Sequence, residues 1–89
     1  MKRLAHAKKR DTNEPEIVAA LRAIGATVFL LDNPVDLLVG KNGKTYLIEV
    51  KNENGTLTKD EEKFIKLWQG NPVKIVKTID EAIEIILND

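Results

Sequence analysis

The dipeptide Asn42-Gly43 constrains the fold of this chain more than any other feature of its sequence. It lies between two stretches rich in apolar residues, 35–40 and 45–51, and Asn-Gly favours the positive φ angles of a two-residue type I′ turn. We therefore expect an antiparallel hairpin in which the numbers of paired residues sum to 85. A four-residue loop would give the same register, whereas a three-residue loop would change it.

Capping signals, periodicity and turn residues place the other elements. The first helix is expected to begin near residues 11–13, with Pro15 in its first turn, and Thr-x-x-Glu capping patterns start at Thr58 and Thr78. In chain order we expect a helix ending at Gly25, strands at 27–31, 35–40 and 45–51, a helix at 59–69, a strand at 73–76 and a helix ending at Leu87.

This order of elements, αβββαβα, predicts an α/β fold. Short connections make the first three strands antiparallel, and the crossover helix makes the third and fourth strands parallel. We expect a mixed sheet with helices on its faces. Residues 11–89 are expected to form one domain, preceded by a basic N-terminal arm at residues 1–10.

The types of side chain present limit any metal site to oxygen ligands. The chain has no cysteine, and its single histidine, His6, lies outside every patterned segment. A bound cation would therefore be Mg²⁺ or Mn²⁺ rather than zinc. No apolar run is long enough to span a membrane and no signal-peptide core is present, so we expect a cytoplasmic protein without a membrane partner.

Two acids and a lysine fall where the sheet pattern predicts burial. Glu49 and Lys51 share a strand face with Leu47, and the hairpin register places Asp36 opposite Glu49. Opposed side chains have Cβ atoms about 4.5–5.5 Å apart, so the two carboxylates repel each other unless a cation lies between them. The pattern predicts a divalent-cation site. Alternatively, Lys51 neutralises both acids in an ion network without chemistry, or the acids lie in water at strand ends.

Two further glutamates share a helix face with apolar residues. Glu14 lies on the same side of the first helix as Ile17 and Val18, which makes it a candidate member of the site. Its alternative role is to interact with the positive end of the helix dipole. Glu61 lies on the core side of the second helix, and we expect it to form a capping box with Thr58 rather than to act directly in catalysis.

Charge is distributed unevenly along the chain. Residues 1–10 carry five basic side chains and no acid, whereas the remaining 79 residues have a net charge of −5. A basic arm on an acidic domain suits a phosphate-rich partner such as nucleic acid. A solvated leader without a partner is the alternative interpretation.

Asp36, followed after twelve residues by Glu49-Val50-Lys51, with Glu14 on an upstream helix, resembles the motif of the PD-(D/E)XK nuclease superfamily. The αβββαβ order also resembles the restriction-endonuclease-like core of that superfamily. The short length and the glycine-terminated first helix are similar to small phage nucleases of the VRR-NUC type, and archaeal Holliday junction resolvases have a similar layout. The chain departs from the pattern at Pro34, which precedes Asp36 by two residues, and at Glu61, where related nucleases often carry a glutamine.

The resemblance implies a Mg²⁺- or Mn²⁺-dependent deoxyribonuclease. The implied cation ligands are the carboxylates of Asp36 and Glu49 and the backbone carbonyl of Val50, with Glu14 completing this site or holding a second ion. Lys51 would orient the attacking water or stabilise the transition state. The implied DNA contacts are made by Lys8, Lys9 and Arg10.

The expected partner is DNA, with junctions and flaps as candidate substrates in a phage or prokaryotic cell. Because so small a domain presents little surface, we also expect a homodimer, with Ile85 and the sheet edges as candidate contacts. The alternative function is a catalytically inactive nuclease-like module that binds nucleic acid or a protein. A third is a small α/β domain whose acids bind metal adventitiously.

Overall fold

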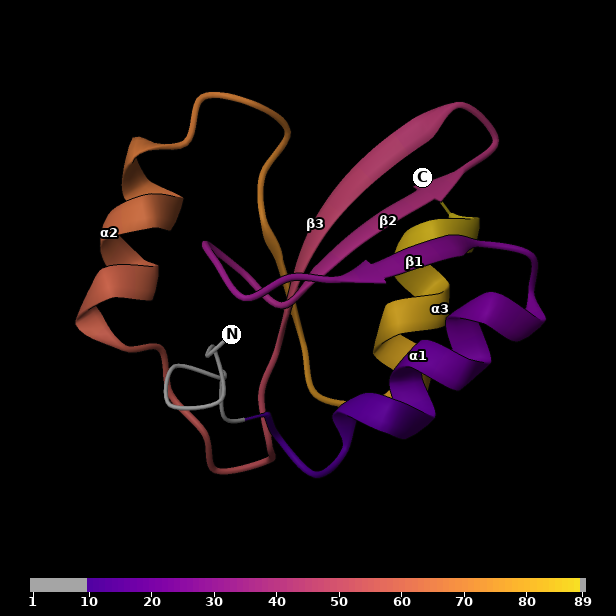
Figure 1. Cartoon of the computed structure of the whole chain (residues 1–89), viewed down its shortest axis with the longest axis horizontal. Coiled ribbons are helices and arrows are strands. Elements are labelled where there is room, and N and C mark those ends of the chain that lie inside the picture. Colours follow the sequence, from indigo (N-terminus) through magenta and orange to yellow (C-terminus); the bar gives the residue numbers. More distant parts are fainter. Residues whose placement is uncertain (1–9, 89) are drawn as a thin grey trace, which may run out of the picture.

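The hairpin around Asn42-Gly43 lies at the centre of a four-stranded sheet (Figure 1). In the computed structural model, which describes residues 10–88, strands β2 (Leu37–Lys41) and β3 (Lys44–Val50) pair antiparallel. Asn42 and Gly43 have φ angles of 55° and 80°, and Lys41 pairs with Lys44. The predicted two-residue loop is confirmed, and so is the register from the pair Lys41–Lys44 to the pair Leu37–Ile48.

The other elements complete the predicted order. The first strand, β1 (Thr27–Leu30), pairs antiparallel with β2, and β4 (Lys74–Val76) pairs parallel with β3, which gives the strand order β1-β2-β3-β4. The helices are α1 (Glu14–Ala23), α2 (Lys59–Leu67) and α3 (Ile79–Leu87). The α/β class and the order αβββαβα are confirmed.

Helices α1 and α3 lie together on one side of the sheet (Figure 1). They cover the strand face that carries Tyr46, Ile48 and Val50, all of which are buried. Removing such apolar side chains from water contributes about 1.5–3 kcal/mol each, so this layer is the main source of stability. None of the helices described is long and apolar enough to cross a bilayer.

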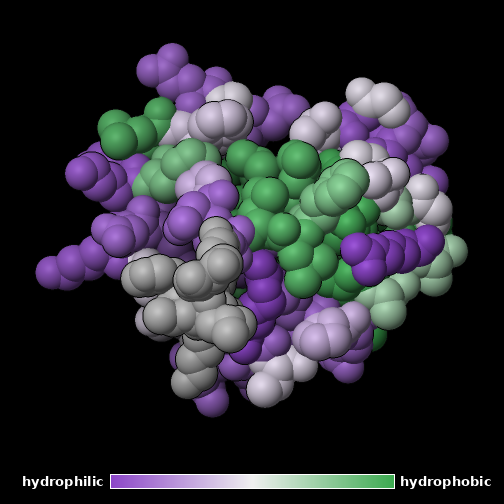
Figure 2. All heavy atoms as spheres, viewed as in Figure 1, coloured by the Kyte–Doolittle hydropathy of each residue, from purple (hydrophilic) through white to green (hydrophobic). Residues whose placement is uncertain are grey.

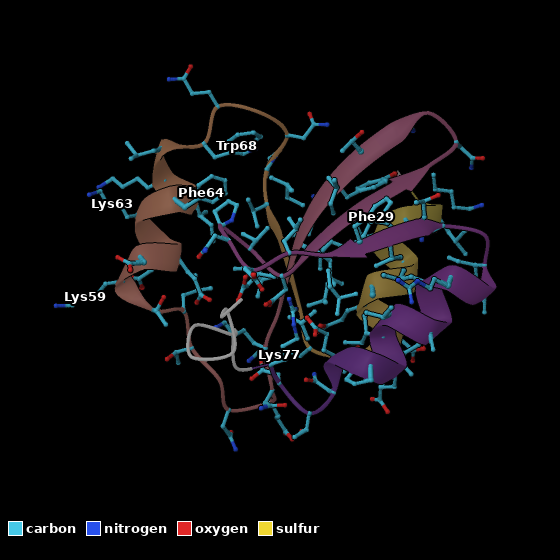
Figure 3. The ribbon with its side chains drawn as sticks, viewed as in Figure 1. Phe29, Lys59, Lys63, Phe64, Trp68 and Lys77 are labelled. Atoms are coloured by element: carbon cyan, nitrogen blue, oxygen red, sulfur yellow. The ribbon has the colours of Figure 1, made fainter. Side chains whose placement is uncertain are left out.

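The prediction that helices cover both faces is only partly confirmed, because α2 buries none of its residues. Its sequence is largely charged, and Figure 1 shows it standing to one side of the strands. Its Phe64 ring lies 5.3 Å from that of Trp68, measured between centroids (Figure 3). The face of the sheet away from α1 and α3 therefore keeps apolar residues at the surface, seen as the green area of Figure 2.

Candidate active site at the open end of the hairpin

The three residues predicted to form the site meet where β2 begins and β3 ends. Asp36 precedes β2 by one residue, Glu49 is the second-last residue of β3, and Lys51 follows that strand directly. Both carboxylates are buried and Lys51 is largely so. The alternative in which these acids lie in water at strand ends is therefore wrong.

The Asp36 carboxylate extends the hydrogen-bonding ladder between β2 and β3. The backbone N–H of Lys51 points towards β4 and donates to the Val76 carbonyl at 2.9 Å. The preceding N–H, that of Val50, points the opposite way and donates to Asp36 Oδ2 at 2.8 Å. This bond holds Asp36 beside the end of β3, and it gives the aspartate a structural role in addition to any chemical one.

Glu14 joins the site through Arg10. Glu14 is buried in the first turn of α1, and Arg10 Nη1 donates to both of its carboxylate oxygens, at 3.0 and 2.8 Å. The same nitrogen lies 3.9 Å from Asp36 Oδ1. Arg10, predicted to contact DNA, is thus directed at the acids in this structure, while the other two predicted DNA contacts, Lys8 and Lys9, lie outside the described residues.

Lys51 lies between two glutamates. Its Nζ is 3.2 Å from Glu49 Oε2 and 2.8 Å from Glu61 Oε1. Glu61 Oε1 also accepts a hydrogen bond from the Thr58 N–H at 2.8 Å, so the predicted capping box is confirmed. Glu61 therefore does two things: it caps α2 and it holds the Lys51 ammonium group.

The pKa values of the two glutamates are moved in opposite directions. Burial, a hydrogen bond with Glu61 and the charge of Asp36 raise the pKa of Glu49 to about 8. For Glu61 burial disfavours ionisation, but hydrogen bonds with Glu49, Lys51 and Thr58 outweigh it and lower the pKa to about 2. At neutral pH and without a metal, Glu49 therefore carries a proton and Glu61 is ionised.

Asn13 is a member of the site that the sequence did not indicate. It was expected among the capping residues of the first helix, and it takes the N-cap position, but its side chain makes no capping hydrogen bond. Its amide instead donates to the carbonyls of Lys51 at 3.0 Å and Lys77 at 2.8 Å. Asn13 thus ties the start of α1 to the residue that follows β3, through contacts for which the sequence carries no local signal.

The donors at this site suit a hard divalent cation in their chemistry. Asp36, Glu49 and Glu14 provide buried carboxylates, and Glu49 Oε1 has no hydrogen-bond partner among the described residues. Over residues 10–88, however, no group of three or more His, Cys, Asp or Glu side chains is arranged to hold a metal ion. Instead Arg10 pairs with Glu14 and lies near Asp36, while Lys51 lies between Glu49 and Glu61, which corresponds in part to the ion-network alternative. A cation would require these side chains to rearrange.

No family model matches the chain, and no curated protein and no solved structure does either. The resemblance to PD-(D/E)XK nucleases therefore rests on the motif around Asp36 and Glu49-Val50-Lys51 and on the order of the elements.

Proposed function

We propose that this chain is a Mg²⁺- or Mn²⁺-dependent endonuclease of the PD-(D/E)XK type that hydrolyses DNA phosphodiester bonds. The observation that carries the proposal is the burial of Asp36 and Glu49 side by side, with Lys51 against Glu49. Burying two carboxylates is costly, and ion networks of this kind contribute little net stability compared with apolar packing. Carboxyl groups with strongly shifted pKa values are typical of functional sites.

Each residue has a defined task in the proposed reaction. Asp36, Glu49 and Glu14 would supply carboxylate ligands, joined by the Val50 carbonyl. The chemistry supplied by the bound cation is polarisation of the scissile phosphate and a lower pKa of a bound water. The Lys51 ammonium group would orient that water and stabilise the charge that develops on the phosphate oxygens. Glu61 would position Lys51.

Assays on linear, nicked, flapped and four-way DNA test the proposal. We expect cleavage of at least one substrate with Mg²⁺ or Mn²⁺ and none with EDTA. Asp36→Asn should abolish cleavage and metal-dependent thermal stabilisation while remaining folded, because asparagine keeps an acceptor oxygen for the Val50 N–H. Alanine is a poorer choice, since an unpaired buried N–H costs about 1–3 kcal/mol.

The outcome also separates the competing functions. A wild-type protein that binds branched DNA in the presence of either metal but cuts none of the four substrates would indicate the inactive binding module. Metal binding that persists unchanged in Asp36→Asn, without DNA binding, would indicate adventitious binding by a small α/β domain. Cleavage retained in Asp36→Asn would contradict the proposed site.

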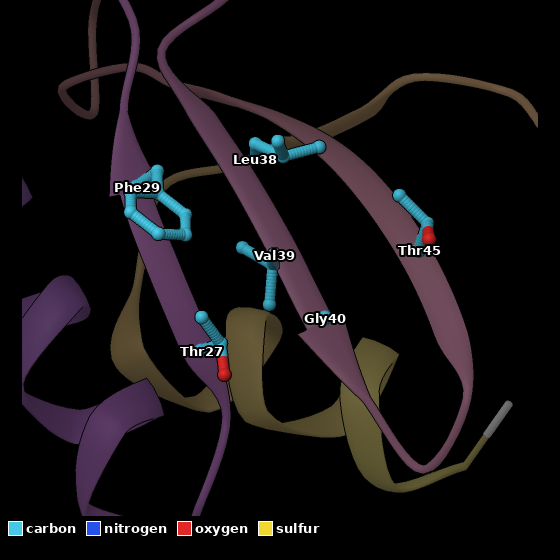
Figure 4. Close-up of a pocket in the computed structure, with 6 residues that line it drawn as sticks. All are labelled: Thr27, Phe29, Leu38, Val39, Gly40 and Thr45. Atoms are coloured by element: carbon cyan, nitrogen blue, oxygen red, sulfur yellow. The ribbon is translucent and has the colours of Figure 1, made fainter.

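The proposal includes a second copy of the chain as a partner. The predicted contact Ile85 is partly buried and packs against the core. The outer sheet face is a better candidate: Phe29, Leu38 and Leu47 form one row across three strands, and Phe29 is 62% exposed. Figure 4 shows the pocket beside Phe29 and Leu38. Exposed apolar patches often mark protein interfaces.

Sedimentation velocity over a range of protein concentrations checks this assembly. We expect a concentration-dependent dimer that Phe29→Ser weakens by about tenfold or more, because an aromatic side chain would leave the interface. Leu87→Ser is the matched control, since Leu87 is also exposed but lies at the end of α3. A wild-type protein that stays monomeric, or an equal effect of both substitutions, would contradict the dimer.

A further inference from the structure

The Arg10 guanidinium occupies a position surrounded by oxygen atoms. Nη1 contacts both carboxylate oxygens of Glu14 and lies 3.9 Å from Asp36 Oδ1. Nη2 donates to the Leu31 carbonyl at 2.5 Å and lies 3.9 Å from Asp32 Oδ1. Carboxylate and carbonyl oxygens are also the ligands that Mg²⁺ and Mn²⁺ prefer. The guanidinium therefore lies among the donors that a divalent cation would use.

For electrostatic reasons the Arg10 guanidinium and a divalent metal ion compete for the Glu14 carboxylate. The Glu14 side chain is only 3% exposed, so its charge is costly to bury, and the charge-assisted hydrogen bonds from Arg10 Nη1 to both carboxylate oxygens offset part of that cost. A divalent cation bound to Glu14 would meet the positive guanidinium within contact distance, where like charges repel strongly in a buried setting. The Arg10 guanidinium and a divalent cation therefore cannot bind the Glu14 carboxylate at the same time.

Arg10 is the member of this pair that can move. Its side chain is 23% exposed, and it precedes α1, whereas Glu14 lies within the helix and is buried. A guanidinium displaced from Glu14 would reach the surface next to the acids. Two parallel N–H donors in one plane suit a phosphate group well.

We propose that Arg10 holds the place of the divalent cation in the metal-free protein, and that binding of the cation releases Arg10 to contact a substrate phosphate. The inference rests on the metal site of the proposed function and deepens it. Because coupling between two binding events is reciprocal, a phosphate that holds Arg10 away from Glu14 also tightens binding of the cation. Metal and DNA would then bind cooperatively through one side chain.

Titration calorimetry with Mn²⁺ alone tests the competition without any cleavage assay. Arg10→Gln should bind Mn²⁺ about tenfold more tightly than wild type, because no ion pair has to be broken first. Arg22→Gln is the matched control: Arg22 lies eight residues after Glu14 in α1 and donates to the Val28 carbonyl. Its Mn²⁺ affinity should equal that of wild type.

Thermal unfolding provides a second readout of Mn²⁺ binding that is independent of the heat measured by titration calorimetry. In EDTA, Arg10→Gln should melt below wild type, since the ion pair between Arg10 and the buried Glu14 is lost. Adding Mn²⁺ should raise its melting temperature by more than it raises that of wild type or Arg22→Gln. With Ca²⁺ and duplex DNA, the slope of log affinity against log salt should fall by about one when Arg10 is replaced.

The outcomes for this inference and for the proposed function are separate. The displacement of Arg10 by the cation is overturned if Arg10→Gln binds Mn²⁺ as tightly as wild type or more weakly, or if neither protein binds Mn²⁺. This holds whatever the cleavage assays give. If Arg10→Gln binds Mn²⁺ more tightly but the wild-type protein cuts none of the four DNA substrates, the displacement of Arg10 by the cation is supported. The proposed endonuclease function is then contradicted. Unchanged salt dependence overturns the phosphate contact.

Discussion

Replacing Lys51 with alanine is expected to lower metal-dependent DNA cleavage by about 100- to 1000-fold, the usual effect of removing a group that stabilises transition-state charge. The ammonium group is held at 2.8 Å from Glu61 and 3.2 Å from Glu49, so it is positioned before substrate arrives. Single-turnover cleavage rates at saturating Mn²⁺ measure the effect. Mn²⁺ binding should persist, because Lys51 is not among the proposed ligands.

Lys44→Ala provides the comparison for this variant. Lys44 is the first residue of β3, at the turn end of the strand, while Lys51 follows its other end. Both substitutions remove one positive charge, but only the loss of Lys51 should slow the chemical step. A Lys51→Ala variant that cleaves DNA at the wild-type rate would contradict the proposed mechanism. An equal loss in both variants would mean that Lys51 contributes only general charge.

Divalent-cation affinity should depend steeply on pH because of Glu49. Its pKa is raised to about 8, chiefly by burial, and a carboxyl group binds a metal only after it loses its proton. Between pH 6 and pH 8 the affinity should rise by about tenfold per pH unit and then level off. Calorimetry in buffers of different ionisation enthalpy should detect about one proton released on binding below pH 8.

Glu49→Gln should bind the cation weakly and remove this pH dependence, whereas Glu84→Gln, on an exposed position of α3, should leave it unchanged. An affinity that does not vary between pH 6 and pH 8 in the wild type would show that Glu49 is not a ligand.

The same pKa shift predicts how the metal-free fold responds to pH. A folded-state pKa of about 8, against an ordinary value of 4.5, means that the folded protein binds more protons than the unfolded chain between these values. The free energy of unfolding should therefore fall as pH rises from 4.5 to 8, by at most about 4 kcal/mol. Glu61, with its pKa lowered to about 2, contributes stability that is lost as pH falls below 4.5. Urea unfolding in EDTA measures both slopes.

The hairpin and the location of the acids were predictable because their signals are local. Asn42-Gly43 sets the loop length, and the two-residue period of a strand then fixes which side chains face one another. Those two facts place Asp36 next to Glu49 without any knowledge of the rest of the fold. The buried position of Glu14 followed in the same way from its spacing to Ile17 and Val18 on one helix.

The contacts that complete the site were not predictable because they join distant segments. The Asn13 amide bonds to carbonyls 38 and 64 residues further along the chain, and Arg10 reaches the Leu31 carbonyl across 21 residues. Such distances depend on how α1 packs against the sheet. The position of α2 was missed for another reason: its spacing of apolar residues predicts a buried face, yet none of its residues is buried, and the Phe64–Trp68 ring contact lies within the end of the helix itself.

The arrangement of α2 also gives the chain its own optical probe. Trp68 is the only tryptophan, is 43% exposed, and directly follows the helix whose first turn contains Glu61, the residue paired with Lys51. Among the described residues, the Glu61–Lys51 ion pair joins α2, which buries none of its residues, to the end of β3. A change at the acids would therefore alter the surroundings of the indole ring, and its emission spectrum would report occupancy of the site without any label.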